Sequence, residues 1–297
     1  MFLYKIFFAM ILSVLFIPCT INFCCGSKTP IVNENVINDI EFEQTSNILE
    51  DYIKCVVAAE MPISFELEAL KAQAVAARTY AIRNYDGVDY KNLYQAYISV
   101  DDMEKKWGAD FEKNYKKICD AVDSTKGQTI KYNGEIIEAV FHSTSAGLTE
   151  NSENVWQRSY PYLKSVDSHD DENAPNFQVE KKIPLKNVIK LINNRYKTNL
   201  TVENFFDKFI IVQRSKAGYI KNINICDKNI NAMEIRMLLG LRSTNFTFKK
   251  GGADIIFVTK GYGHGSGMSQ YGANFMAQRG YDYKQILQHY YSGVEIT

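Results

Sequence analysis

The chain opens with an apolar run and then alternates between amphipathic segments and short polar connections. Ile6 to Cys25 carry no charge and are about as long as a membrane-spanning helix. Because no clear small-x-small cleavage site follows, we expect residues 1–27 to form a membrane anchor. Two alternatives stay open: a cleaved signal peptide with Lys5 as its charged region, and a lipoprotein signal that ends at Cys24.

A polar stretch, residues 28–44, has the composition of a tether and precedes a helical pattern. From Ser46 on, apolar residues recur at spacings of three and four: Ile48, Leu49, Tyr52, Ile53, Val56 and Val57. This periodicity predicts a helix with one face toward a core, and the next step of the stripe reaches Glu60. Pro62 cannot continue the helix, so we expect it to end beside Glu60.

A second helix is predicted from Phe65 to Asn84, with Ser64 as its N-cap. Its expected buried face has side chains small enough for close helix packing: Leu67, Leu70, Ala74, Ala77 and Ala81. The two helices therefore meet at a Glu-Met-Pro corner.

The middle of the chain combines helix and strand signals. Phe111 to Ser124 has a helical pattern, and Asn133-Gly134 between alternating runs predicts a hairpin. The second strand of that hairpin is expected to deliver residues 142–145 to a loop that ends at Gly147.

The last third alternates in the same way. Between Ile183 and Phe248 we expect one or two helices, a hairpin centred on Gly218 and a helix at Ala232 to Leu239. A strand at residues 254–259, a glycine-rich segment, and helices to Gln278 and from Asp282 to Tyr291 follow. The fold class is therefore α+β, with a helical corner packed against short antiparallel strands. We expect one domain at residues 45–297, within which 177–250 form a candidate subdomain.

Composition and charge limit the classes of ligand and partner that the chain can be expected to bind. Lys plus Arg and Asp plus Glu both number 34 in 297 residues, so no net charge attracts the chain to nucleic acid. Three cysteines beyond the anchor are too few and too scattered for a disulfide framework, and nothing has the spacing of a zinc motif. A metal site assembled from distant residues such as Cys119 and His142 stays open.

The three glutamates around the corner differ in environment. Glu66 and Glu68 fall on the polar side of a helix start, where an ionised carboxylate is stable. Glu60 falls on an apolar stripe at a helix end, where burial and the helix dipole both raise the pKa of a carboxyl. A raised pKa suits a general acid. The alternative is that a salt bridge with Arg78 or Lys71 neutralises Glu60.

The segment "GYGHGSGMSQYGA", residues 261–273, has alternating glycines that allow close backbone approach. Its spacing is not that of a dinucleotide-binding loop, and Ser266 lacks the flanking glycines of a nucleophile elbow. His264 is either a ligand-binding or catalytic imidazole or a hydrogen-bonded histidine in a tight loop.

Three blocks together resemble the stage II sporulation protein D family, which also contains amidase-enhancer proteins of the bacterial cell wall. They are "VVAAEMPISFELEALKAQAVAARTYA", "FHSTSAGLTENSENVW", and "MEIRMLLGLRSTNF" with "GYGHGSGMSQYGANFMAQRGYDYKQILQHYYSG". The resemblance extends over nearly all of Tyr52 to Gly293.

The resemblance implies a lytic transglycosylase, which cleaves the β-1,4 bond between N-acetylmuramic acid and N-acetylglucosamine and leaves a 1,6-anhydro end. Its catalytic acid is the glutamate of the Glu-Met-Pro block, here Glu60. One carboxyl suffices if the sugar's own 6-hydroxyl is the nucleophile, whereas a hydrolase usually needs a second carboxylate. A noncatalytic glycan-binding protein that enhances a cell-wall amidase is the alternative.

The resemblance also implies residues that line or support the cleft: Gln73, Arg78, Tyr80, His142, Ser143, Thr144, Gly263, His264, Gly265, Ser269 and Gln270. Ser145 stands where some members have cysteine, so we predict no required metal and no cofactor. Denuded glycan strands, an amidase and membrane proteins of the engulfment complex are the implied partners. The implied location is the mother-cell membrane, with the domain outside the cytoplasm facing the septal wall.

Overall fold

A computed structural model describes residues 34–87, 89–90, 93–156 and 158–297, with side chains from residue 47 on. The chain divides into two compact units, Met1–Phe42 and Glu43–Thr297. The expected anchor, residues 1–27, lies outside the described residues. Within the described ranges, no helix combines the length and apolar character needed to cross a bilayer. The fold class is α+β, as predicted.

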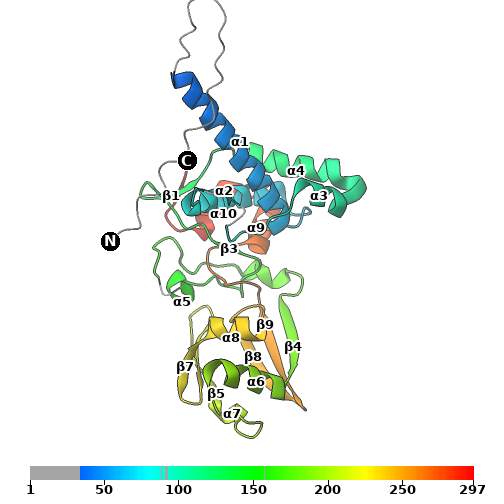
Figure 1. Ribbon diagram of the computed structural model, residues 1–297, viewed down its shortest axis with the longest axis vertical. Helices are drawn as coiled ribbons and strands as arrows, with labels where there is room; N and C mark the ends of the chain where they lie inside the picture. The colour runs from blue at the N-terminus through cyan, green and yellow to red at the C-terminus, as the bar shows by residue number, and fades with distance from the viewer. Residues whose placement is uncertain (1–33, 88, 91–92, 157) are drawn as a thin grey trace, which may run out of the picture. The chain divides into compact units, whose positions relative to one another are not determined.

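The first hydrophobic core is built mainly from helices (Figure 1). Most of its buried side chains come from α1 (Glu34–Glu60), α2 (Leu67–Asn84), α4 (Phe111–Asp123), α9 (Gln270–Gln278) and α10 (Tyr283–Tyr290). The alanine-rich α2 packs against α4, α9 and α10, because its small side chains let those helices approach closely. Its predicted face is buried at Leu70, Ala74, Ala77 and Ala81, and Leu67 is partly buried.

The corner between α1 and α2 forms where it was predicted, with two corrections. The helix α1 ends at Glu60, but it begins at Glu34, so the predicted tether is helical from there on. That stretch contains no glycine or proline, the two residues that most disfavour a helix interior. The N-cap of α2 is Glu66 rather than Ser64, and its side chain makes no capping hydrogen bond. The Glu66 N–H donates to Asn274 Oδ1 at 2.8 Å, and this tertiary contact holds the chain where the helix begins.

The tyrosine-rich connection after α2 contains a helix that the periodicity did not predict. This helix, α3 (Val100–Trp107), begins at Ser99, whose Oγ accepts from the Asp102 N–H. A 3₁₀ turn, η2 (Gly108–Asp110), then leads into α4, which matches the predicted helix.

The predicted hairpin is confirmed at its turn and corrected at its second strand. Strands β1 (Ile130–Tyr132) and β2 (Glu135–Ile136) pair antiparallel across Asn133 and Gly134, both at positive φ, and β11 (Glu295–Ile296) joins β1. The chain then leaves that sheet, and β3 (Phe141–His142) pairs parallel with β10 (Met268–Ser269). His142 therefore reaches the site on a strand that a distant segment holds.

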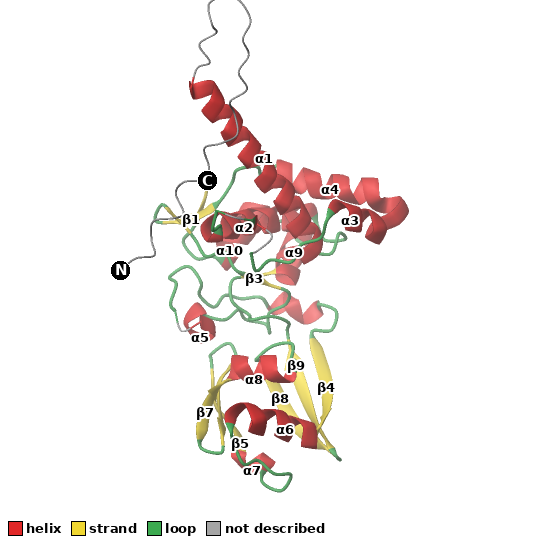
Figure 2. Ribbon diagram, in the orientation of Figure 1, coloured by secondary structure: helices red, strands yellow, loops and turns green. Residues whose placement is uncertain are grey.

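The second core is built from two three-stranded antiparallel sheets and their helices (Figure 2). One sheet has the order β4-β9-β8, with β4 (Gln178–Pro184), β8 (Phe246–Gly251) and β9 (Asp254–Lys260). The other has the order β5-β6-β7, with β5 (Phe209–Arg214), β6 (Ile220–Ile225) and β7 (Lys228–Asn231). The helices are α6 (Leu185–Tyr196), α7 (Phe205–Lys208) and α8 (Ala232–Leu239). The Gly218 hairpin and the helix at 232–239 agree with the sequence-based expectation.

Two short elements lie between the cores in sequence, α5 (Ser152–Trp156) and the 3₁₀ helix η3 (His169–Asn173). The predicted domain boundaries, including a subdomain at 177–250, stay predictions. The buried residues of the second core extend from Leu185 to Phe257, so they include strand β9 beyond that predicted limit.

Candidate active site

Glu60 is the last residue of α1, and both of its carboxylate oxygens accept hydrogen bonds. The Ala96 N–H donates to Oε1 at 2.8 Å, and the Gln270 amide donates to Oε2 at 3.1 Å. Gln270 begins α9, and its amide also lies 3.4 Å from Gln73 Oε1 on α2. Three segments that are far apart in sequence therefore converge on one carboxyl group.

Burial raises the pKa of the Glu60 carboxyl above its usual range, although the hydrogen bonds from Ala96 and Gln270 act in the opposite direction. No cation forms a salt bridge with Glu60 among the residues described. Lys71 instead pairs with Glu68, and Arg78 pairs with Glu50. The alternative of a neutralising salt bridge to Arg78 or Lys71 is therefore wrong.

Arg78 supports the fold from within the core. It is fully buried, and its Nε and Nη2 donate to the two oxygens of Glu50 at 2.9 and 2.6 Å. The same guanidinium donates to the carbonyls of Gln128 and Val122 at 3.2 and 3.4 Å. This bidentate pair joins α1 to α2 and to the segment after α4. A side chain so enclosed does not contact a ligand in this conformation.

Glu60 lines a pocket of about 620 Å³, which we call the acid pocket. Glu60 is the one carboxylate among the described residues that line it, and Lys106 and Arg242 bring positive charge. Its other walls include the helix corner, Trp107, Tyr262 and Tyr271, and the predicted residues Ser143, Thr144 and Gln270. Four of the residues expected from the sequence thus share one cavity.

The glycine-rich segment passes close to strand β3. A Cβ at Gly267 would lie 2.1 Å from the Val140 carbonyl oxygen, and one at Gly263 would lie 2.7 Å from His142 Cβ. Both glycines also have positive φ, which side chains disfavour. This close approach permits the parallel pairing of β3 and β10, which aligns Ser269 with His142. A Cβ at Gly265 would lie 2.6 Å from the Tyr219 ring, so Gly263 and Gly265 both support the walls rather than line them.

Asp171 is a functional candidate that the sequence did not single out. Its buried carboxylate accepts from the Ser145 N–H at 2.7 Å, from Ser168 Oγ at 3.0 Å and from Ser269 Oγ at 2.9 Å. Ser269 Oγ in turn accepts from the Gly272 N–H as the N-cap of α9. Asp171 thereby holds the start of α9, and hence Gln270, against the loop that carries Ser143 and Thr144.

The two predicted histidines are neutral imidazoles with different surroundings. Burial holds the pKa of His142 far below its usual range, and its Nδ1 lies 3.1 Å from the Ser266 carbonyl. Burial also lowers the pKa of His264 to about 4, and its Nδ1 accepts from the Ser266 N–H at 3.2 Å. In the part of the chain with described side chains, no three His, Cys, Asp or Glu residues gather as a metal site would require.

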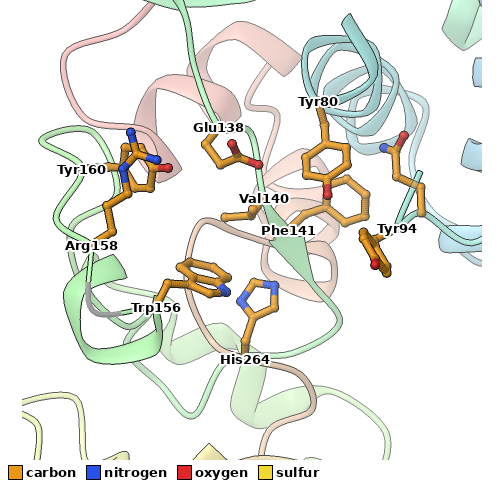
Figure 3. A pocket seen from close by; sticks show the side chains of 10 residues that line it. Tyr80, Tyr94, Glu138, Val140, Phe141, Trp156, Arg158, Tyr160 and His264 are labelled. Atoms are coloured by element: carbon orange, nitrogen blue, oxygen red, sulfur yellow. The ribbon is translucent and has the colours of Figure 1, made fainter. Parts of the chain in front are cut away.

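A second pocket of about 490 Å³, here called the aromatic pocket, is lined largely by aromatic side chains (Figure 3). Figure 3 shows Trp156 beside His264, with ring centroids 5.0 Å apart, and Arg158 against Tyr160. The remaining lining residues are Tyr80, Tyr94, Gln95, Glu138, Val140 and Phe141. Gln95 lines this pocket while its neighbour Ala96 donates to Glu60, so residues 95–96 connect the wall of the aromatic pocket with the carboxyl of the acid pocket.

The structure thus sorts the predicted residues into three groups. The first group lines the acid pocket: Glu60, Ser143, Thr144 and Gln270. Tyr80 and His264 line the aromatic pocket. The third group lies behind these walls: Gln73, Arg78, His142, Gly263, Gly265 and Ser269. Periodicity could not find Arg242, Tyr262 or Trp156, because their role depends on which distant segments meet.

Comparison with known proteins points to one family. A family described as "Stage II sporulation protein" matches residues 39–132. The chain is 40% identical over 260 residues to stage II sporulation protein D of Bacillus amyloliquefaciens, covering 84% of this chain and 74% of that protein. The Bacillus subtilis (strain 168) protein of the same name is 39% identical over the same shares.

A more distant relative carries a different name. An amidase enhancer of Bacillus subtilis (strain 168) is 32% identical over 300 residues, covering 82% of this chain and 40% of that protein. With about two fifths of its residues shared over most of both sequences, the chain belongs to the stage II sporulation protein D family.

Proposed function

We propose that the protein is a lytic transglycosylase that cleaves the β-1,4 bond between N-acetylmuramic acid and N-acetylglucosamine. The observation that carries this proposal is the setting of Glu60. It is half-buried, it forms no salt bridge with a described residue, and it is the one carboxylate among the described residues lining its pocket. A carboxyl with a raised pKa retains the proton that a general acid must deliver.

A single carboxyl can perform both halves of this reaction. Protonated Glu60 gives its proton to the glycosidic oxygen as the bond from that oxygen to C1 breaks. The resulting carboxylate then takes the proton from the sugar's 6-hydroxyl while O6 bonds to C1, which closes the 1,6-anhydro ring. No water enters, so no second carboxylate is needed to activate it. Glu138, in the aromatic pocket, is paired with Arg83 at 3.0 Å.

Gln270 and Gln73 fit both protonation states of Glu60. In this structure the Gln270 amide nitrogen faces Glu60, where it can donate to the ionised carboxylate. Gln73 Nε2 has no partner among the described groups. A half-turn of the Gln270 amide presents its oxygen, which accepts the proton of the neutral acid. A half-turn of the Gln73 amide then lets its nitrogen donate to Gln270. The pair therefore supports Glu60 before and after proton transfer.

The aromatic pocket offers room for sugars on one side of the cleaved bond. Tyr94 is almost fully exposed and Trp156 is 42% exposed, so both rings present faces to solvent. Sugar rings stack on such faces through their apolar C–H edges, and the rings' polar atoms remain available for hydrogen bonds. In this proposal a glycan strand that occupies both pockets runs past residues 95–96 and the Glu60 carboxyl that Ala96 contacts.

The proposal extends to the cellular setting that the family resemblance implies. The chain acts on peptidoglycan during engulfment in sporulation, from the mother-cell membrane, through an N-terminal anchor at residues 1–27. Its substrate is glycan stripped of peptides, so an amidase precedes it, and membrane proteins of the engulfment complex accompany it. No metal or other cofactor takes part in the proposed reaction.

The test is digestion of denuded peptidoglycan by the purified protein, with products identified by mass spectrometry. We expect anhydro-ended fragments from the wild type and none from a folded Glu60→Gln variant. A folded variant that still released anhydro ends would remove Glu60 from the mechanism.

The similarity to an amidase enhancer favours one further candidate function, a noncatalytic glycan-binding protein that stimulates an amidase. In that case the wild type retains denuded strands, releases no fragments and accelerates an added amidase. The Glu60→Gln variant then behaves as the wild type does.

A further inference from the structure

The side chain of Arg242 has no charged partner in the acid pocket. It forms no hydrogen bond or salt bridge with a described residue, and its Nε is buried without a partner. Most buried guanidinium groups have their donors satisfied, because an unsatisfied buried donor is costly. Arg242 lines the pocket with its terminal N–H groups unpaired among the described residues, so an acceptor carried by a ligand can satisfy them.

Arg242 is also held in a defined position. Its carbonyl accepts from the Gly263 N–H at 3.0 Å and from Arg236 Nε at 3.2 Å. Its guanidinium carbon lies 4.1 Å from the centroid of the Tyr262 ring, which fixes the plane of the group. A stacked guanidinium keeps its edge free for a planar acceptor, and two of its N–H groups fit both oxygens of a carboxylate.

The pocket as a whole favours an anion. Lys106 lines it as a second cation, and Glu60, the one acidic group among its described lining residues, already accepts from Ala96 and Gln270. Glu60 therefore does not satisfy Arg242. The negative charge that pairs with Arg242 must therefore come from the ligand.

Only one group of the proposed glycan carries charge. N-acetylglucosamine is neutral, whereas N-acetylmuramic acid bears a lactyl ether on O3 that ends in a carboxyl group. This carboxyl is an ionised carboxylate when no peptide is attached, and it becomes a neutral amide when a stem peptide is attached. The charge of the lactyl group therefore depends on whether the stem peptide has been removed.

We propose that Arg242 forms a carboxylate site that binds the free lactyl group of a muramic acid residue beside the cleaved bond. Arg242 is then the residue through which the acid pocket distinguishes stripped strands from peptide-bearing ones. The proposal rests on the proposed function for the identity of the glycan, but not on cleavage itself.

The test measures binding by titration calorimetry, with Glu60→Gln in the full chain as background so that no turnover occurs. Three ligands are compared: a denuded glycan oligomer, the same oligomer with every lactyl carboxylate converted to a methylamide, and a peptide-bearing oligomer. We expect the denuded oligomer to bind about tenfold to a hundredfold more tightly than the other two, as the loss of one charged hydrogen-bonded contact implies.

Adding Arg242→Gln should weaken binding of the denuded oligomer by the same factor and leave the methylamide oligomer unchanged. Arg158→Gln is the matched control, because Arg158 also stacks on a tyrosine, at 4.9 Å from the Tyr160 ring, but in the aromatic pocket. This control should preserve the preference for the denuded oligomer. Should Arg242→Gln fail to fold, the comparison of the three ligands on the Glu60→Gln protein still decides.

Equal binding of denuded and methylamide oligomers overturns the proposal, as does a complete absence of glycan binding. Tight binding of the peptide-bearing oligomer that is lost in Arg242→Gln also overturns it, because Arg242 would then contact a peptide carboxylate. Failure of the proposed function looks different: the wild type releases no anhydro ends, whatever the three affinities are.

Discussion

The Gln270 amide donates to Glu60 Oε2 at 3.1 Å and joins residues that are 210 positions apart in the sequence. One residue ends α1 and the other begins α9. The start of α9 is itself fixed by Ser269 and Asp171, which are 2.9 Å apart. The protonation of Glu60 therefore depends on a helix start that a buried carboxylate holds in place.

Gln270→Leu tests this dependence through the pH profile. The hydrogen bond that the Gln270 amide nitrogen donates to the carboxylate is charge-assisted and lowers the pKa of Glu60. It is stronger than the bond that the amide oxygen can accept from the neutral acid, so loss of Gln270 should raise that pKa further. A general acid loses activity as pH rises through its pKa, so the alkaline limb of kcat/KM should move to higher pH. The maximal kcat/KM should fall about tenfold, as expected for one hydrogen bond to a charged group. Gln288→Leu, at an exposed position on α10, is the control. An alkaline limb that stays in place would contradict the assignment of Glu60 as the acid.

Glu60→Gln should change stability in a pH-dependent way. Burial raises the pKa of Glu60 above its ordinary value of 4.5, so folding favours the protonated form. This contribution is fully present below the unfolded pKa and is lost as pH rises through the folded pKa. The ionised carboxylate is therefore destabilising at neutral pH, and the neutral amide is not. We expect the variant to match the wild-type Tm near pH 4 and to exceed it by a few degrees, about 1–4 °C, near pH 8. A difference independent of pH would remove burial as the cause.

Arg78→Met should strongly destabilise the protein. The change leaves the 4%-exposed Glu50 without the fully buried guanidinium that now binds both of its oxygens. Breaking a buried pair costs about 3–5 kcal/mol in free energy of unfolding. Lys116→Met is the control, because its pair with Asp120 is exposed and should matter by less than about 0.5 kcal/mol. Urea unfolding measures both variants, and equal losses would contradict the structural role given to Arg78.

Gly267→Ala and Gly252→Ala separate backbone strain from close approach. The two glycines have φ of 73° and 71°, but a Cβ meets the Val140 carbonyl oxygen only at Gly267. Gly252→Ala should cost about 1 kcal/mol, the strain that a side chain adds at such a φ. Gly267→Ala should cost about a further 1–3 kcal/mol from overpacking, and it should lower activity because β10 leads into Gln270. Similar thermal shifts for the two variants would show that the contact between the glycine-rich segment and β3 is loose.

Local signals predicted much of this fold. Asn133-Gly134 marked a hairpin turn because both residues adopt positive φ, and apolar spacing predicted α2, α4 and α8. The distinction of Glu60 from Glu66 and Glu68 also came from spacing, since the apolar stripe of α1 runs into Glu60. These features depend on neighbouring residues, which the sequence places next to each other.

Contacts between segments that are distant in the sequence could not be predicted from these local patterns. The choice of Glu50 as the partner of Arg78, the parallel pairing of β3 with β10, and the role of Asp171 all join distant segments. Asp171 lies among the consecutive acidic residues of η3, and no feature of the sequence distinguishes its carboxylate from those of its neighbours. Arg242 likewise becomes a candidate binding residue only because the folded chain brings it and Tyr262 into the pocket that Glu60 lines. Tertiary packing decides each of these, and no periodicity encodes it.

The most direct test of the account is digestion of denuded glycan in water enriched in ¹⁸O, followed by mass spectrometry of the new muramic acid ends. If Glu60 passes its proton to the leaving oxygen and takes one from the sugar's 6-hydroxyl, each new muramic end is an anhydro sugar. These ends then contain no ¹⁸O, and the products disappear in folded Glu60→Gln. New reducing ends that carry one ¹⁸O would contradict the account, because a water molecule would then have attacked C1.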